Sequence, residues 1–138
     1  MLPDGLRARI VAEALAAFPN ECCGLIEGEH ASEIVRVHAL HATANVNADP
    51  ASGFEIDPAA HLRLLRSLRG SGHTIVGCYH SHPNGRPGPS ERDRENGCED
   101  VFIWLIAALD GAAGAVALAA FEGPSFRPVA LAEAPPCA

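Results

Sequence analysis

The sequence lacks a surplus of basic residues. Lysine and arginine together number 10, against 17 aspartates and glutamates, and the formal net charge is -7 at pH 7. Proteins that bind nucleic acids neutralise phosphates with clustered basic side chains, so this balance argues against a nucleic-acid partner. The same deficit disfavours docking on anionic membranes.

The sequence also lacks the apolar segments that export or membrane insertion require. Residues 1–10 contain no apolar core of a signal peptide. The longest apolar run, Val101 to Leu109, is too short for a transmembrane helix and is expected to be a buried strand. The five cysteines are odd in number and form no C-x-x-C pair. Free thiols in a cytoplasmic protein are therefore expected.

The length and composition fit one globular domain. The chain has 138 residues, of which 48% are hydrophobic and 20% are charged, so disorder is excluded as its main state. We expect one domain over residues 1–133 and a flexible tail over residues 134–138.

Hydrophobic periodicity predicts three helices and six strands, which together indicate an α+β fold with a curved mixed sheet packed against the first two helices. Asp4 is expected to cap the first helix, and Leu62, Leu65 and Leu68 are expected to face inward from the second. A turn is expected at 28–31 and a hairpin turn at Asp110-Gly111. The predicted helices are Asp4–Phe18, Pro58–Leu68 and Ser90–Gly97, and the predicted strands are Cys22–Glu27, Glu33–Leu40, His73–His82, Val101–Leu109, Ala115–Phe121 and Phe126–Leu131.

One stretch, residues 80–93, has the pattern of a metal site. Side chains two apart on a strand leave the same face, so His80 and His82 present two imidazoles side by side. A loop rich in proline and glycine then folds back, and Asp93 lies one turn into the helix that Ser90 opens. Three protein ligands leave the fourth tetrahedral position to water, as a catalytic zinc requires.

Each part of this pattern also has a purely structural interpretation. Two histidines can end a strand in solvent, and Ser90-x-x-Asp93 matches a capping box that stabilises a helix. The four residues at fixed spacing are expected by chance in about 10⁻³ of proteins of this size, so the combination favours the metal site. Ser90 can both cap the helix and direct its hydroxyl at a substrate.

The pattern His80-x-His82, seven residues, Ser90, two residues, Asp93 resembles the signature of the JAMM (MPN-plus) metallopeptidases. The segment Pro19-Asn20-Glu21-Cys22-Cys23-Gly24 is similar to the one that carries a glutamate after the first helix of that family. The resemblance implies the MPN fold, which is like that of cytidine deaminases. It also implies a zinc ion held by His80, His82 and Asp93, with Glu21 as general acid/base and Ser90 as the oxyanion stabiliser. Further likeness lies at Asn45, at residues 54–58 and at residues 76–77.

The resemblance also implies a reaction. Family members cleave a peptide or isopeptide bond after the C-terminal Gly-Gly tail of ubiquitin or ubiquitin-like β-grasp proteins, and small bacterial relatives are associated with sulfur-carrier proteins. The short chain favours such a carrier tail as substrate. The alternative is a non-catalytic MPN-type interaction module, although such modules typically lose ligands that are all present here. A zinc deaminase would need H-x-E and P-C-x-x-C, and neither occurs.

Cys78 departs from the family pattern, because small bacterial relatives often carry an aromatic there. It lies two residues before His80 on the same face of the predicted strand, where a thiolate could compete for the metal. A packing role is expected, because Asp93 already completes the ligand set. The five histidines outside the pattern are interpreted as surface or core residues; they are His30, His38, His41, His61 and His73.

Overall fold

The computed structural model describes residues 1–96, 102–110 and 115–132. Six strands of the described chain form one mixed sheet in the order β2-β1-β3-β4-β5-β6. The β3 and β4 strands pair in parallel, and every other neighbouring pair is antiparallel. The predicted α+β class is confirmed. The elements are α1 (Asp4–Ala17), β1 (Cys23–Ala31), β2 (Ile34–Thr43), α2 (Pro58–Ser67), β3 (Thr74–His82), α3 (Glu91–Asn96), β4 (Ile103–Asp110), β5 (Ala115–Glu122) and β6 (Arg127–Val129).

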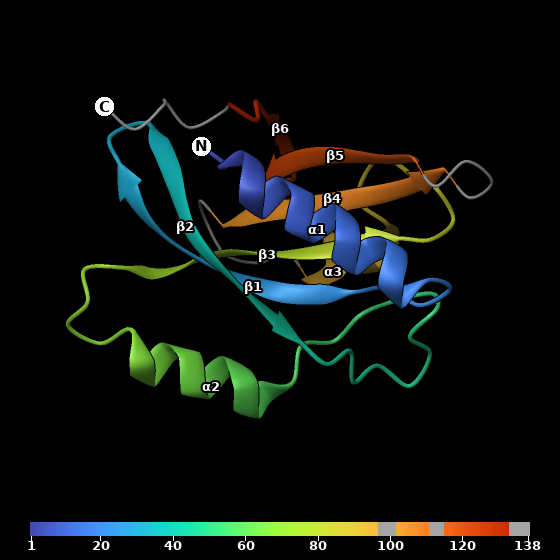
Figure 1. Ribbon diagram of the computed structural model, residues 1–138, viewed down its shortest axis with the longest axis horizontal. Helices are drawn as coiled ribbons and strands as arrows, with labels where there is room; N and C mark the ends of the chain where they lie inside the picture. The colour runs from blue at the N-terminus through green and yellow to red at the C-terminus, as the bar shows by residue number, and fades with distance from the viewer. Residues whose placement is uncertain (97–101, 111–114, 133–138) are drawn as a thin grey trace.

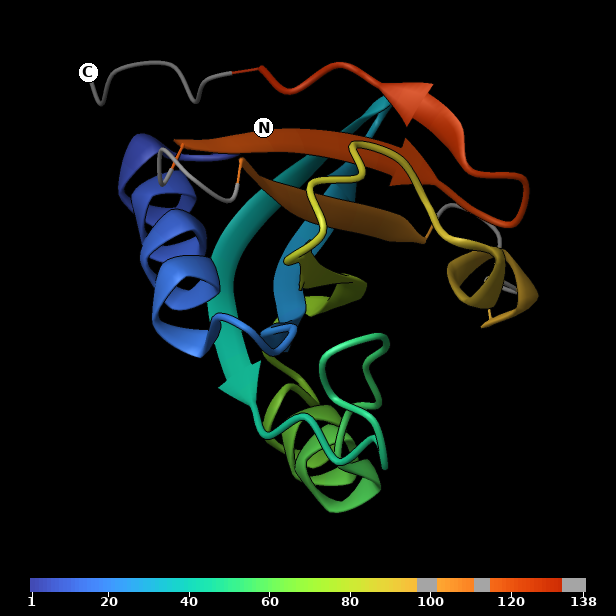
Figure 2. The same cartoon turned by 90° about the vertical axis from the view of Figure 1, so that its right-hand side faces the viewer.

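The curved sheet separates the helices. Figure 1 shows α1 running across one face of the sheet and α2 below β1, and the turned view in Figure 2 shows α3 on the other side from α1. The sheet therefore has a face covered by α1 and a second face toward α2 and α3. None of the helices described is both long and apolar enough to cross a membrane.

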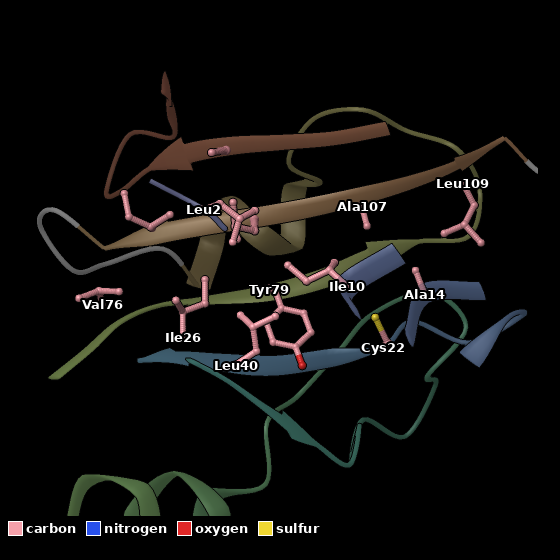
Figure 3. Packing of buried hydrophobic residues seen from close by; sticks show 13 residues of the cluster. Leu2, Ile10, Ala14, Cys22, Ile26, Leu40, Val76, Tyr79, Ala107 and Leu109 are labelled. Carbon is pink, nitrogen blue, oxygen red and sulfur yellow. The ribbon is translucent and has the colours of Figure 1, made fainter. Parts of the chain in front are cut away.

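The face under α1 is an apolar core centred on β3. Tyr79 is fully buried there, and Figure 3 shows it beside Ile10, Ile26 and Leu40. Its hydroxyl donates a hydrogen bond to Oε1 of Glu13 on α1 at 2.9 Å. Burying a large apolar side chain contributes about 1.5–3 kcal/mol, so this cluster stabilises the strand that carries the candidate ligands.

The opposite face of β3 begins with Cys78 and continues with the two motif histidines. Cys78 is buried in a second cluster, in which Leu64 of α2 packs beside Leu25 and Trp104. This position agrees with the expected packing role of Cys78. No disulfide joins the three cysteines that are described, which are Cys22, Cys23 and Cys78.

Two predictions for the N-terminal half are wrong. Asp4 lies inside the first turn of α1, and the capping position belongs to Pro3, whose side chain makes no capping hydrogen bond. The turn between β1 and β2 is at 32–33 rather than 28–31, with Ser32 at φ 59°. Gly28 lies within β1 instead, because its lack of a Cβ lets the Arg36 carbonyl approach closely.

The inward face of α2 also differs from the prediction. Leu62 and Leu65 are each 47% exposed, whereas Leu64 is 7% exposed. The spacings 62-65-68 and 64-68 both fit a helical period, and contact with Leu25 and Cys78 selects the second. Leu68 packs against the same cluster, as predicted. The last strand, Arg127–Val129, is shorter at both ends than the predicted Phe126–Leu131. It begins one residue late because Phe126 turns into the core at φ 57°. Gly111 and the predicted tail lie outside the described residues.

Gly77 tests how tightly the centre of the sheet is packed. A Cβ at Gly77 would lie far inside contact distance of the Ile103 carbonyl oxygen on β4. We expect Gly77→Ala to lower the free energy of unfolding by about 1–3 kcal/mol or more, measured by urea denaturation. The matched control is Gly5→Ala on α1, which has nothing within 4 Å and should be as stable as the wild type or more so. Equal stability of Gly77→Ala and wild type would contradict the β3–β4 register.

Candidate metal centre

The pairing of β1 with β3 brings distant segments together at one end of the sheet. Cys23 pairs with His80. One residue further out, the Cys22 N–H donates to Oγ of buried Ser81 at 2.8 Å, and the Ser81 N–H donates to the Cys22 carbonyl at 3.2 Å. These two bonds fix the chain next to Glu21. Glu21 is thereby held beside the histidines although it lies about 60 residues earlier in the chain.

Three atoms that can bind a metal converge at the end of β3, and we call them the donor triangle. Nε2 of His80 and Nε2 of His82 are 3.0 Å apart, and each lies 3.0–3.1 Å from Oδ2 of Asp93. All three side chains are buried, with 0–4% of their surface exposed. Ligand atoms around a tetrahedral zinc at 2.0–2.1 Å would be about 3.3 Å apart, so this triangle has nearly the size that such an ion needs.

The hydrogen-bonding pattern of His82 favours a cation in the triangle. Its Nδ1 lies 2.9 Å from the carbonyl oxygen of Arg86, which can only accept, so Nδ1 carries a proton. Burial would lower the pKa of His82, but its hydrogen bonds with Asp93 and with the Arg86 carbonyl raise it, so a proton on Nε2 can bridge to Oδ2 of Asp93. A single proton bridges only one of the three atom pairs, whereas a metal ion satisfies all of them.

The surroundings of His80 also favour a cation in the triangle. It is fully buried, and its Nδ1 has no hydrogen-bond partner among the described residues. The Phe54 ring stacks on it with centroids 4.2 Å apart, and the Trp104 ring meets it edge-on at 6.0 Å. Burial lowers the pKa of His80, against the opposing effect of Asp93. The ring is therefore held rigid and neutral, with Nε2 as the atom that faces the other donors.

Asp93 belongs to both a helix cap and the donor triangle. The Asp93 N–H donates to Oγ of Ser90 at 3.0 Å, and the Ser90 N–H donates back to Oδ2 of Asp93 at 2.9 Å. This is the predicted capping box. Burial alone would raise the pKa of Asp93, but the contacts with His80 and His82 outweigh it and hold that pKa well below its usual range.

Glu21 stands beside the triangle. One of its carboxylate oxygens and one nitrogen from each of His80 and His82 all lie within 4.8 Å of one another. Glu21 is buried, which raises its pKa to about 7, with Asp93 adding to the shift and His82 and Arg92 opposing it. The buried Glu-His-His group fits a metal site, with Asp93 as the further oxygen donor.

An open pocket adjoins the metal centre along the same face of the sheet. It has a volume of about 410 Å³, and two of its walls, Phe54 and Trp104, are the rings that contact His80. Its remaining lining residues are Leu25, Asn47, Glu55, Ile56, Cys78, His61 and Phe102. A ligand in this pocket would lie against aromatic side chains within reach of the donor triangle.

Sequence reasoning noted Asn45 only as part of the family likeness and assigned it no role. Its Nδ2 donates to the carbonyl oxygens of Glu21 and Gly53, each at 3.0 Å, and its Oδ1 accepts from the N–H groups of Asn47 and Glu55, each at 3.1 Å. One amide thus connects the backbone at Glu21 with the loop that carries Phe54. The sequence feature that could have indicated this role is an asparagine in a polar loop, because asparagine side chains often form hydrogen bonds with nearby backbone groups.

All five predicted site residues lie in this region of the fold. The structure brings Glu21, His80, His82 and Asp93 together and places Ser90 in direct contact with Asp93. Ser81, which connects the two strands, was not predicted to have a function. The sequence feature that could have identified Ser81 is a small polar residue between two histidines, on the face of β3 that packs under α1.

Comparison with known proteins agrees with this geometry. The model of the family described as prokaryotic homologs of the JAB domain matches residues 3–122. A desampylase of Haloferax volcanii is 38% identical over 93 residues, which are 67% of this chain and 66% of that protein. A probable TtuB-protein conjugate cleaving protease of Thermus thermophilus is 37% identical over 92 residues, which are 67% of this chain and 59% of that protein.

A solved structure supports the fold. The crystal structure of a JAB1/MPN domain protein from Archaeoglobus fulgidus superposes with a TM-score of 0.58 at 19% identity, covering 94% of this chain and 91% of that chain. Similarity at this level of identity concerns the fold alone. It confirms the predicted MPN architecture.

Asn45 yields a prediction about the loop beside the metal centre. Asn45→Ala removes both donors and the acceptor, and we expect a loss of about 1–3 kcal/mol in the free energy of unfolding. Asn45→Asp keeps the acceptor for Asn47 and Glu55 but turns a carboxylate oxygen toward the carbonyl oxygens of Glu21 and Gly53, so its loss should be at least as large as that of Asn45→Ala. Urea denaturation measures both, and amide hydrogen exchange should show faster exchange at Glu55. Wild-type exchange in Asn45→Ala would mean that the loop is held by other contacts.

Proposed function

The chain belongs to the family of prokaryotic homologs of the JAB domain, and from this premise we propose that it is a zinc-dependent hydrolase of the cytoplasm. The bond cleaved would be a peptide or isopeptide bond at the C-terminal Gly-Gly tail of a ubiquitin-like β-grasp protein, such as a sulfur carrier. The observation that carries the proposal is the buried triangle of His80, His82 and Asp93 with Glu21 beside it.

The substrate class is proposed from the relatives. One is named a desampylase and another a protease that cleaves TtuB-protein conjugates, so both names describe removal of a protein modifier. This chain spans about two thirds or less of their length. The family model matches residues 3–122, a range that includes Glu21, His80, His82 and Asp93. The complete donor set disfavours the alternative of a non-catalytic interaction module, which would not need it.

Zinc is proposed as the ion because of the donor chemistry. Two imidazole nitrogens and one carboxylate oxygen are a common set for catalytic zinc, which keeps one position open. When bound, zinc lowers the pKa of a coordinated water to about 7 and polarises a carbonyl as a Lewis acid. His80, His82 and Asp93 would hold it, and the Arg86 carbonyl would fix the tautomer of His82.

We assign proton transfer to Glu21. Its side chain is buried next to the histidine nitrogens, and its backbone is held on both sides by the Pro50 carbonyl and by Asn45. A carboxylate fixed in this position can take a proton from the attacking water and give it to the leaving amine. Glu21 would thus act without being a ligand.

Ser90 is proposed to stabilise the oxyanion. Its Oγ accepts the Asp93 N–H, which leaves the hydroxyl hydrogen available to donate. The capping box ties Ser90 to Asp93, so this hydroxyl would lie close to the scissile carbonyl of a substrate held at the ion. The same residue would serve both the helix and the reaction.

Glu21→Gln tests the mechanism. The amide is nearly isosteric but cannot accept the proton, so we expect turnover to fall about 10²–10⁴-fold with metal content unchanged. The assay is cleavage of a β-grasp protein whose Gly-Gly tail is joined to a lysine ε-amine, followed by intact-protein mass. The exposed Glu33→Gln in the β1–β2 turn is the control and should retain wild-type turnover. Wild-type turnover by Glu21→Gln would remove Glu21 from the mechanism.

Ser90→Ala separates capping from catalysis. Loss of a cap costs about 0.5–2 kcal/mol, whereas loss of an oxyanion donor lowers turnover about 10²–10³-fold. We expect both effects, with turnover normalised to folded, metal-loaded protein. Asp57→Ala is the matched control, because Asp57 caps α2 through the Ala59 N–H and should lose stability only. A fall of less than about threefold in Ser90→Ala would show that Ser90 is a cap alone, since an oxyanion donor contributes far more.

A further inference from the structure

Three histidines outside the metal centre gather around one carboxylate, Glu27 of β1. Nδ1 of His73 lies 2.7 Å from Oε2 of Glu27, and Nε2 of His41 lies 2.9 Å from Oε1. The ring of His38 packs against that of His73, with centroids 4.1 Å apart. The sequence predicted these three histidines to be surface or core residues. The structure brings them together from β2 and from the residue before β3.

An irregularity in the sheet produces this convergence. The register between β1 and β2 shifts at Glu27, because Glu27 pairs with Ala39 and Gly28 pairs with Val37, so His38 is an extra, unpaired residue. The register between β1 and β3 shifts at the same place, between Ile26 and Glu27. A bulge of this kind redirects a side chain, and such bulges are common next to functional sites.

We propose that Glu27, His38 and His73 form a second binding site for a divalent transition metal, with His41 as an additional donor. One ligand atom from each of the first three residues lies within 4.8 Å of the others. Imidazoles and one carboxylate are the donors that zinc and its neighbours in the transition series prefer. Glu27 is available as an anion: burial would raise its pKa, but hydrogen bonds from His41 and His73 hold that pKa below its ordinary value.

This site is separate from the metal centre. Glu27 pairs with Ile75 on β3, five residues before His80, which corresponds to about 16 Å along a strand. His38 is exposed and the other members are partly exposed, so water can complete the coordination and the metal can exchange. A metal here would join β1, β2 and the start of β3, and it would therefore stabilise the fold without taking part in hydrolysis.

The competing interpretation is a hydrogen-bonded cluster, in which the histidines donate to Glu27 and no metal enters. Metal binding must displace those protons, so acid weakens it. The two interpretations therefore differ in metal stoichiometry and in the effect of metal on thermal stability.

The test is the number of Zn²⁺ ions bound per full chain at pH 7.5, measured by calorimetric titration after chelator treatment. The exposed His38→Asn should fold normally and bind one ion fewer than the wild type, and Glu27→Gln should do the same. His30→Asn, which removes an exposed histidine outside both sites, should bind as many ions as the wild type. His82→Asn should still be stabilised thermally by Zn²⁺, because it keeps the second site.

Equal zinc stoichiometry in wild type, His38→Asn and Glu27→Gln would overturn the proposal and leave a hydrogen-bonded cluster. Loss of thermal stabilisation by Zn²⁺ in His82→Asn would do the same. These readouts do not depend on turnover, so a failure of the proposed hydrolase activity would leave them unchanged.

Discussion

A single carboxylate oxygen, Oδ2 of Asp93, connects the parts of the metal centre. It lies 3.0 Å from Nε2 of His80, 3.1 Å from Nε2 of His82 and 2.9 Å from the backbone nitrogen of Ser90. The end of β3 and the start of α3 therefore meet at one buried atom. Burying a carboxylate is costly unless it is paired and hydrogen-bonded, so a cation at this point is favoured by the fold itself.

One face of the central strand β3 packs in the apolar core, and the other face presents the two candidate histidine ligands. Tyr79 and Ser81 face α1, where Tyr79 anchors the apolar core and Ser81 fixes the strand segment that follows Glu21. His80 and His82 alternate with them and face the donor triangle. Because side chains alternate between the two faces of a strand, the same nine residues of β3 hold the fold together and position the two histidine ligands.

The sequence was most informative where chemistry depends on local spacing. The positions of His80, His82 and Asp93 follow from one strand, one loop and one helical turn, and Glu21 was identified through the family resemblance. What depends on tertiary contacts could not be predicted. The prediction of which face of α2 is buried was wrong because two helical spacings fit its leucines. The grouping of His38, His41 and His73 depends on a register shift that no local pattern encodes.

The most direct test of the metal centre is X-ray absorption at the zinc edge on the purified Glu27→Gln variant, in which the second site is removed. The donor triangle predicts about four nitrogen and oxygen ligands at about 2.0–2.1 Å, with the outer-shell scattering of two imidazoles. Cys78 lies on the same face of β3 and packs in the neighbouring apolar cluster. A sulfur ligand at about 2.3 Å, or no bound zinc in the folded protein, would contradict the assignment of His80, His82 and Asp93.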